Sequence, residues 1–313
     1  MKIKRVLQKN TKLNTWYINK KWKQRNISLG KENPDKKFYV IRRAPGKVGL
    51  FSYVSTNLGH IKYAVDHGYI PIIDMQNYRN TYLEDEQIGK VNAWEFYFKQ
   101  PCGYTLSDIK KSKNVILSSG IINCGVEYPD SQIAYDENLY REWKNFADNY
   151  LKIADDIAEE TEKICDKLFD EKRVLGVLAR GTDYVQSRPR KHPIQPSTEE
   201  LIKKCQEIMG RYRCEKVYLT TEDEQIYSEF EKNFGDKLIS MKVQRYKTVD
   251  RENINDVINK DKQKYINGKE YLISILLLAK CNCLVAGNAG GTQGALLLTK
   301  GYEYKYIFDL GVY

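Results

Sequence analysis

The chain lacks the long apolar stretches that membrane proteins need. Its 313 residues contain no run that approaches the ~18 apolar residues of a membrane span. The basic start, MKIKRVLQKN, also has no continuous apolar core of the kind found in signal peptides. Hydrophobic residues make up 42% and charged residues 29%, which is typical of a soluble globular protein. We therefore expect a cytoplasmic protein, and the length favours two domains.

Motifs for metal ions and disulfides are missing as well. The seven cysteines form no CxxC pair, and their odd number suits no closed set of disulfides. Cys281 and Cys283 are the closest pair, but no histidine stands near them in the sequence. No Asp-x-Asp motif occurs, which argues against the sugar transferases that hold Mn²⁺ or Mg²⁺ with it. We expect no metal site, and free thiols in a reducing compartment.

Positive charge is concentrated near the N-terminus. The net charge is +10, and residues 1–47 contain fifteen Lys and Arg residues against Glu32 and Asp35. Apolar and aromatic residues between positions 3 and 17 fit one helical face among these lysines. We interpret residues 1–37 as a basic arm, which could contact the inner face of an anionic membrane. The alternative is a solvated arm, or a helix packed on its own domain. Nucleic acid is not an expected partner, because no binding motif accompanies the charge.

Apolar runs of strand length alternate with helical patterns along the chain. The predicted strands span residues 38–43, 69–74, 114–119, 173–180, 216–221, 282–287 and 304–308. The predicted helices span residues 57–67, 135–169, 198–210, 222–233, 269–281 and 292–299, two of them opened by capping boxes at Ser197 and Thr221. This alternation predicts α/β domains with parallel sheets covered on both faces. After the arm we expect two Rossmann-like domains, residues 38–155 and 156–313.

Three turns that follow strands in the second half carry polar or glycine-rich sequence, and ligands of open α/β sheets bind at the carboxyl ends of strands. Arg180 ends the apolar run GVLA and stands three residues before Asp183. A guanidinium group placed there suits a phosphate, and Asp183 could orient it or accept a proton. An ion pair that closes the turn is the alternative.

The other two turns suit the remaining parts of a nucleotide. After the strand KVYLT, the side chains of Thr221, Glu222 and Asp223 could accept hydrogen bonds from a nucleobase or ribose, or could simply cap the next helix. The late turn AGNAGGTQG lies between a buried strand and an apolar helix, where backbone N–H groups favour an anion. Tight helix packing is its alternative, since the turn is neither GxGxxG nor a P-loop. Its candidate residues are Gly287, Asn288, Ala289, Gly290, Gly291 and Thr292. Together the three turns predict a nucleoside-diphosphate site.

Several segments resemble the α1,6-fucosyltransferase family. ARGTDYVQSRPRKHPI is similar to its donor-site motif, and VYLTTEDE and LLLAKCNCLVAGNAGG are similar to two later segments. In the first half, GLFSYVSTNLGHIKYAVDHGYIPIIDMQNYR and NAWEFYF follow the family's order, so the resemblance covers roughly residues 40–310. It implies a GT-B fold, in which two Rossmann-like domains face a cleft, the first on the acceptor side and the second binding the nucleotide sugar. It also implies an inverting, metal-independent transfer with no cofactor besides the donor, GDP-fucose.

The resemblance also implies roles for single residues. Arg180 would bind the diphosphate, Asp223 would face the guanine, and the backbone of Ala289 and Gly290 would donate to phosphate. Leu178 and Gly181 stand where the family has His and Arg.

The family's loop glutamate, a proposed general base, has no counterpart between Asp183 and Glu199. Asp183 and His192 are therefore candidate bases, with Asp74 from the first half as another. We expect a glycosyltransferase of surface-polysaccharide synthesis that acts on a glycan or lipid-linked oligosaccharide. A transferase that uses another nucleotide sugar, or a nucleotide-binding protein without catalysis, is the alternative.

Overall fold

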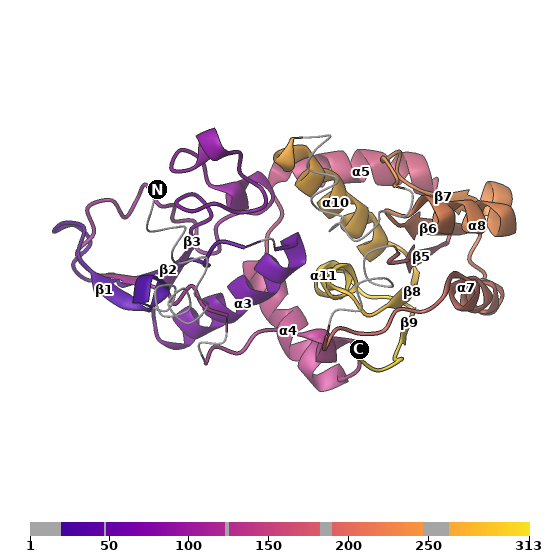
Figure 1. Cartoon of the computed structure of the whole chain (residues 1–313), viewed down its shortest axis with the longest axis horizontal. Coiled ribbons are helices and arrows are strands. Elements are labelled where there is room, and N and C mark those ends of the chain that lie inside the picture. The colour runs from indigo at the N-terminus through magenta and orange to yellow at the C-terminus, as the bar shows by residue number, and fades with distance from the viewer. Residues whose placement is uncertain (1–19, 47, 123–124, 182–189, 247–262) are drawn as a thin grey trace, which may run out of the picture. The chain divides into compact units, whose positions relative to one another are not determined.

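The computed structural model describes residues 20–46, 48–122, 125–181, 190–246 and 263–313. The contacts within the chain divide it into two compact units, whose elements are labelled in Figure 1. Unit 1 comprises Met1–Val48, Tyr53–Tyr128 and Tyr150–Lys152, and unit 2 comprises Gly49–Ser52, Pro129–Asn149 and Ile153–Tyr313. This division differs from the predicted domains, because residues 20–37 join unit 1 and residues 129–149 join unit 2.

Unit 1 is built on a four-stranded sheet with the order β1-β4-β2-β3. Strands β2 (Phe38–Ile41), β3 (Ile70–Ile73) and β4 (Val115–Leu117) are parallel, as predicted. Strand β1 (Arg25–Ile27) pairs antiparallel with β4, and the sequence did not predict it because Arg-Asn-Ile gives no apolar run. Helix α3 (Leu50–Asp66) connects β2 to β3, and the 3-10 turns η1 (Asp85–Gln87) and η2 (Ala93–Phe96) precede β4.

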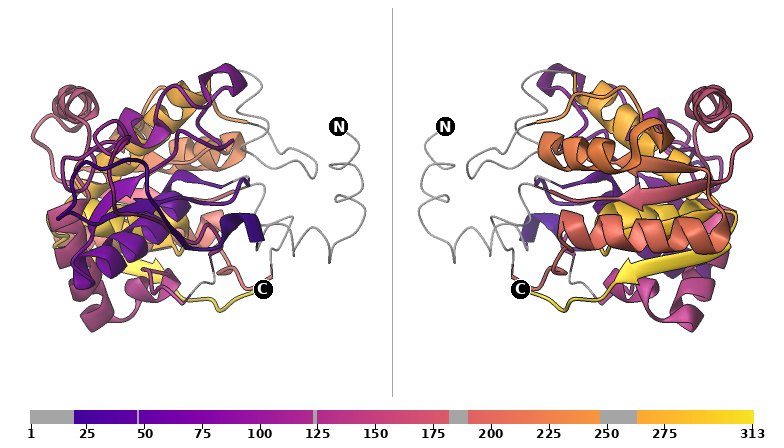
Figure 2. Two further views of the ribbon diagram at one scale, coloured as in Figure 1. Left: turned by 90° about the vertical axis from the view of Figure 1, so that its left-hand side faces the viewer. Right: turned by 90° about the vertical axis from the view of Figure 1, so that its right-hand side faces the viewer.

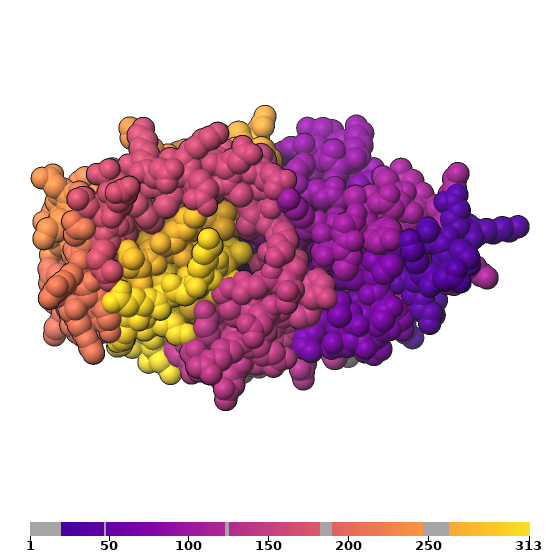
Figure 3. All heavy atoms as spheres, turned by 180° about the vertical axis from the view of Figure 1, so that it is seen from behind, coloured from indigo at the N-terminus to yellow at the C-terminus, as the bar shows by residue number. Residues whose placement is uncertain are grey.

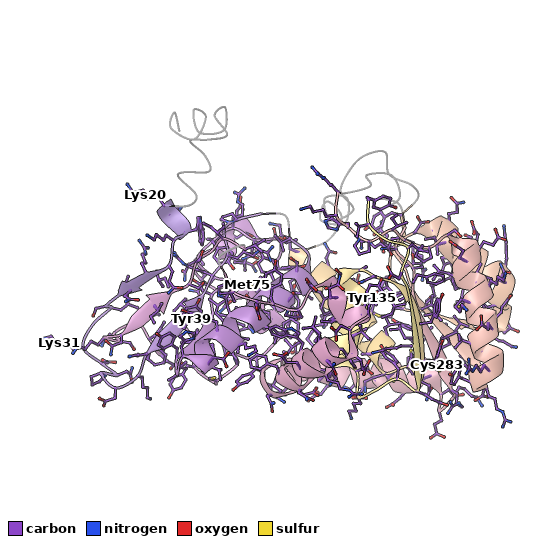
Figure 4. All side chains as sticks on the ribbon, turned by 90° about the horizontal axis from the view of Figure 1, so that it is seen from below. Lys20, Lys31, Tyr39, Met75, Tyr135 and Cys283 are labelled. Atoms are coloured by element: carbon purple, nitrogen blue, oxygen red, sulfur yellow. The ribbon has the colours of Figure 1, made fainter. Side chains whose placement is uncertain are left out.

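The two faces of β2 are buried differently. Phe38 and Val40 enter an apolar cluster with Ile72, whereas the intervening Tyr39, labelled in Figure 4, points to the other face, as the period of two residues requires. There its hydroxyl lies 3.0 Å from Nδ1 of His60 of α3. His60 is 7% exposed, and this burial lowers its pKa to about 4.

Unit 2 is built on a five-stranded, fully parallel sheet with the order β7-β6-β5-β8-β9. The strands are β5 (Val174–Leu178), β6 (Lys216–Thr220), β7 (Leu238–Ile239), β8 (Cys283–Gly287) and β9 (Tyr304–Phe308), and β7 alone was not predicted. Helices α7 (Thr198–Tyr212) and α8 (Glu224–Phe234) cover one face, as Figure 2 shows in its right-hand view. Helix α10 (Lys264–Ala279) packs on β5 and β6 from the opposite side and contacts α5 (Asp155–Phe169) and α11 (Gly290–Leu298).

The remaining elements of unit 2 precede the sheet in sequence or connect its strands. These are the 3-10 turns η3 (Ser131–Ala134) and η4 (Gly235–Lys237) and helix α4 (Glu137–Tyr150). Helix α4 lies beside the C-terminal residues, coloured yellow in Figure 3. Its Glu137 carboxylate accepts a hydrogen bond from Lys305 of β9 at 3.1 Å, and the Lys305 ammonium lies 3.9 Å from the ring centre of Tyr140. These contacts explain why residues 129–149 belong to unit 2.

Two predictions about helices are corrected by the structure. The predicted helix 135–169 is two helices, α4 and α5, which are interrupted at residues 151–154. The capping box at Ser197 is confirmed, but the one at Thr221 is wrong. Helix α8 begins at Glu224, because the Asp223 carboxylate accepts hydrogen bonds from the N–H groups of Gln225 and Ile226. None of the helices in the described residues combines the length and apolarity that crossing a bilayer requires.

Burial of His60 predicts a pH-dependent stability of unit 1. The unfolded chain binds a proton on this residue below pH ~6.5, whereas the folded chain keeps the ring neutral down to about pH 4. The stabilisation is therefore present above pH 6.5 and is lost as the pH falls toward 4, by about 3 kcal/mol in total. Urea unfolding at several pH values should show a steeper loss for the wild type than for His60→Gln. The exposed His67 offers a control, and an equally flat profile for His67→Gln would contradict the assignment.

Candidate functional site

The parallel pairing in unit 2 brings three polar turns to one edge of the sheet. Leu178, the last residue of β5, lies in register with Thr220 of β6 on one side and with Ala286 of β8 on the other. Arg180, the turn 221–223 and the turn 287–291 therefore leave the sheet at its carboxyl edge from adjacent strands. The sequence predicted that the three turns follow strands of one domain, and the structure adds that these strands are neighbours in the sheet.

Arg180 forms an ion pair with the neighbouring turn. Its Nη1 atom lies 3.3 Å from Oε1 of Glu222, and the two side chains are 20% and 19% exposed. The sequence suggested an ion pair with Asp183 instead, but that residue lies outside the described residues. An anion that approaches Arg180 must therefore compete with Glu222, which the sequence assigned to the nucleobase or ribose.

Asp223 has a structural role as the N-cap of α8. It is 6% exposed, and its Oδ1 atom accepts from Gln225 N–H at 2.8 Å and from Ile226 N–H at 3.1 Å. Its own N–H donates to Oγ1 of Thr221, which is buried as well. A Cβ atom on Gly181 would overlap with Oδ2 of Asp223, so no larger residue fits at that position without a shift. The capping alternative thus holds for Asp223, and the prediction that it faces a guanine stays a prediction.

The turn between β8 and α11 ends in a helix start that has no side-chain cap. Ala289 is the N-cap of α11 and offers no side-chain acceptor, whereas α7 and α8 are capped by Ser197 and Asp223. Ala289 is 7% exposed, and no group of the described residues accepts a hydrogen bond from its N–H. Buried N–H groups at a helix start favour an anion, through hydrogen bonds and through the helix dipole.

Packing also shapes this turn. Cβ atoms on Gly287 or Gly291 would overlap with Gln195 and Leu178, respectively. Gly290 has more room, with its nearest outside neighbour, Phe51, 3.8 Å from the position of a Cβ atom. The packing alternative therefore holds for Gly287 and Gly291 beside the anion-binding interpretation. Close packing and anion binding are compatible here, since close packing fixes the turn that presents the N–H groups.

Two of the candidate bases lie in described residues. His192 is exposed in unit 2, and its carbonyl oxygen accepts from Tyr313 N–H at 3.0 Å. Asp74 is buried in unit 1, where its Oδ1 accepts from the N–H groups of Gln76 and Asn77 at 2.9 and 3.0 Å. The Asp74 carboxylate thus fixes the turn after β3, which weighs against a role as a base.

Unit 1 contains a buried polar cluster that the sequence reasoning missed. Arg43, two residues after β2, is 9% exposed, donates to Oγ1 of Thr56 at 3.2 Å, and lies 5.1 Å from the ring centre of Tyr53. Burial lowers the pKa of Arg43 and raises that of Tyr53 to about 12. The signal was available, because the strand FYVIRR delivers arginine to its carboxyl end just as GVLAR does.

No group of three or more His, Cys, Asp or Glu side chains in the described residues could hold a metal ion. The site in unit 2 thus offers a guanidinium group and backbone N–H donors, with a carboxylate beside them. This donor set suits a phosphorylated ligand.

Comparison with known proteins finds its matches among solved structures. No family model matches the chain, and no curated protein matches it by sequence. The fucosyltransferase NodZ from Bradyrhizobium is similar, with 17% identity, a TM-score of 0.51, and 88% of this chain and 96% of that chain covered. POFUT1 in its apo form is similar too, with 11% identity, a TM-score of 0.54, and 88% and 99% covered.

A structure of POFUT1 in complex with GDP also matches, at 10% identity and a TM-score of 0.52, covering 87% of this chain and 99% of that chain. At these identities the likeness shows the fold. The predicted GT-B-like α/β fold and its resemblance to the fucosyltransferases are therefore confirmed.

The Arg180–Glu222 pair makes a prediction about anion binding. Glu222→Gln removes the competing carboxylate, so inorganic pyrophosphate should bind about fivefold more tightly, the equivalent of one partly exposed ion pair. Isothermal titration calorimetry measures the change. Glu224→Gln removes the same charge two residues further on and should leave the affinity close to that of the wild type. Equal gains in both variants would show a general charge effect and contradict the competition.

Proposed function

We propose that this chain is an inverting, metal-independent glycosyltransferase that moves fucose or a related sugar from a GDP-sugar to a glycan acceptor. The observation that carries the proposal is the placement of Arg180 and of the uncapped α11 N-terminus on adjacent strands of one sheet edge. An arginine and a set of backbone donors there can hold the two phosphates of a nucleoside diphosphate.

The fold is a second observation that supports this proposal. NodZ, which shares the fold, is a fucosyltransferase, and POFUT1, which shares it too, has a structure in complex with GDP. The same order of motifs along this chain led to the sequence resemblance. Fold alone does not fix an activity, so the chemistry of the site must support it.

The transfer would proceed by a single displacement at the anomeric carbon. An acceptor hydroxyl forms the new C–O bond, the bond from the anomeric carbon to the β-phosphate oxygen breaks, and GDP leaves with the electron pair. Arg180 and the N–H groups of Ala289 and Gly290 would neutralise the charge that develops on the leaving diphosphate. No metal ion is needed in this scheme, because these groups take over the electrostatic role.

The acceptor hydroxyl must lose its proton to a base. Asp183 and His192 are our candidates, since both belong to the segment that follows Arg180 in the chain. A positioned base contributes about 10²–10⁴-fold to such a transfer. Asp74 is the weaker candidate because its Oδ1 already accepts two backbone hydrogen bonds and its Oδ2 accepts one from the side chain of Asn77.

Two substitutions relative to the family motif favour a second candidate, a transferase with a different nucleotide sugar. Leu178 is buried, and its Cδ1 atom lies where a Cβ atom on Gly291 would overlap with it. Gly181 lies against the side chain of Asp223 in the same way. Neither can supply the histidine and arginine contacts of the family. The acceptor class, a role in surface-polysaccharide synthesis, and membrane contact through residues 1–37 at the inner face of the membrane remain predictions from the sequence.

The nucleotide preference can be read from thermal unfolding with GDP, UDP, ADP or GMP in the presence of EDTA. We expect GDP to raise the melting temperature most, because ligands that bind only the folded state stabilise it by mass action. A larger shift with UDP or ADP would favour the second candidate. No shift with any nucleoside diphosphate would contradict both.

The role of Arg180 is tested by Arg180→Ala, with Arg173→Ala as the matched control. Arg173 stands directly before β5, whereas Arg180 follows it, and Arg173 forms an ion pair with the exposed Glu303. Arg180→Ala should weaken GDP binding about tenfold to hundredfold, since it loses charge-assisted hydrogen bonds, and should reduce transfer further. Arg173→Ala should keep both. Near-wild-type turnover of Arg180→Ala would refute the donor-site assignment.

A further inference from the structure

Residues 191–195 run beside the C-terminal residues and end at the turn between β8 and α11. The N–H of Lys191 donates to Tyr313 O at 3.0 Å, and the N–H of Ile194 donates to Gly311 O at 2.9 Å. Pro193 forms an antiparallel bridge with Val312. This backbone pairing fixes the place from which Gln195 reaches the turn.

The side-chain amide of Gln195 forms a hydrogen bond with the backbone of that turn. Its Nε2 atom donates to Asn288 O at 2.9 Å and to Pro193 O at 3.1 Å, and the residue is 7% exposed. Two carbonyl acceptors on one side of the amide fix its orientation, because only the NH₂ group can donate to them. The Oε1 atom is then turned toward Gly287, at which a Cβ atom would overlap with it.

The hydrogen bond to Asn288 O sets the direction of the next N–H group. In a trans peptide, the C=O of one residue and the N–H of the following residue point in opposite directions. With the Asn288 carbonyl held toward Gln195, the N–H of Ala289 points away from it. The Ala289 carbonyl in turn accepts from Gln293 N–H at 3.0 Å, so the helix begins directly after this oriented peptide.

Further contacts hold the same turn. Thr292 Oγ1 donates to Gly287 O at 2.6 Å, and the Asn288 side chain donates to Ser131 O of η3 at 2.9 Å. The adjacent Tyr135, labelled in Figure 4, donates to Phe308 O at 2.9 Å. Both carbonyls before the N-cap are thus fixed by buried side-chain donors, and the peptide has little freedom to flip.

We infer that Gln195 is a positioning residue, which aims the Ala289 N–H at a phosphate oxygen of the nucleoside diphosphate. This inference rests on the proposed function, since it assigns the phosphate group of that ligand to the turn. Gln195 itself does not touch the ligand. It acts through the Asn288–Ala289 peptide, and nothing in the three polar turns alone identifies it.

Gln195→Met tests the inference, because methionine keeps the length of the side chain but cannot donate. The affinity for GDP and for inorganic pyrophosphate should fall about tenfold to hundredfold, the effect of losing one charge-assisted hydrogen bond. The affinity for guanosine, which has no phosphate, should stay unchanged. A merely structural role would weaken guanosine and GDP together, and that result would overturn the inference.

Gln293→Met is the matched control. Gln293 Nε2 donates to Oδ1 of Asn288 at 3.4 Å, so this variant removes an amide from the same turn without releasing the Asn288 carbonyl. It should keep the affinity for pyrophosphate. Gln195→Glu, which replaces the donor with a carboxylate, should lose that affinity at least as strongly as Gln195→Met.

A measurement on the wild-type protein guards against misfolded variants. Pyrophosphate should shift the backbone amide resonance of Ala289, and an unchanged resonance at saturation would overturn the inference.

The positioning role of Gln195 and the proposed GDP-sugar donor can be refuted separately. Unchanged GDP affinity in a folded Gln195→Met would refute the positioning role only. If the wild-type protein prefers UDP over GDP, the proposed GDP-sugar donor is refuted. Loss of pyrophosphate binding in Gln195→Met would still support the positioning role in that case.

Discussion

The parallel pairing of β5 with β6 and β8 is the constraint on which the site depends. Because parallel strands share one carboxyl edge, residues from three distant parts of the chain leave the sheet side by side. The strands themselves are fully buried in their middle residues, so their register cannot slip without exposing apolar side chains. The rigid sheet thus fixes both Arg180 and the turn before α11.

The electrostatics of this edge combine fixed donors with an internal competitor. The side chains of Ser197 and Asp223 accept hydrogen bonds from N–H groups at the starts of α7 and α8, but the N-cap of α11 is Ala289, which has no side-chain acceptor. The N–H groups of the buried Ala289 and of the exposed Gly290 therefore favour an anion from outside the chain. Arg180, in contrast, already pairs with Glu222. Phosphate binding would exchange one partner of Arg180 for another, which lowers the net gain but sharpens the selection for a strongly charged ligand.

The sequence predicted the frame of unit 2 well, because its strands are continuous apolar runs and its turns carry Gly, Thr and Asp. Strands β1 and β7 escaped prediction, since three and two residues give no periodic signal. The candidate residues Arg180 and Glu222 were found, but their pairing was not, because the reach of two side chains across adjacent strands is a tertiary property. Gln195 was missed for the same reason, whereas Arg43 carried a sequence signal, an arginine directly after an apolar strand, that was overlooked.

A crystal structure of the protein with GDP tests the central claim most directly. The account predicts that the diphosphate lies within hydrogen-bond distance of the Ala289 N–H and of the Arg180 guanidinium group, with Gln195 still bound to Asn288 O. GDP bound with its phosphates away from the β8–α11 turn, and with the Arg180–Glu222 pair undisturbed, would contradict it.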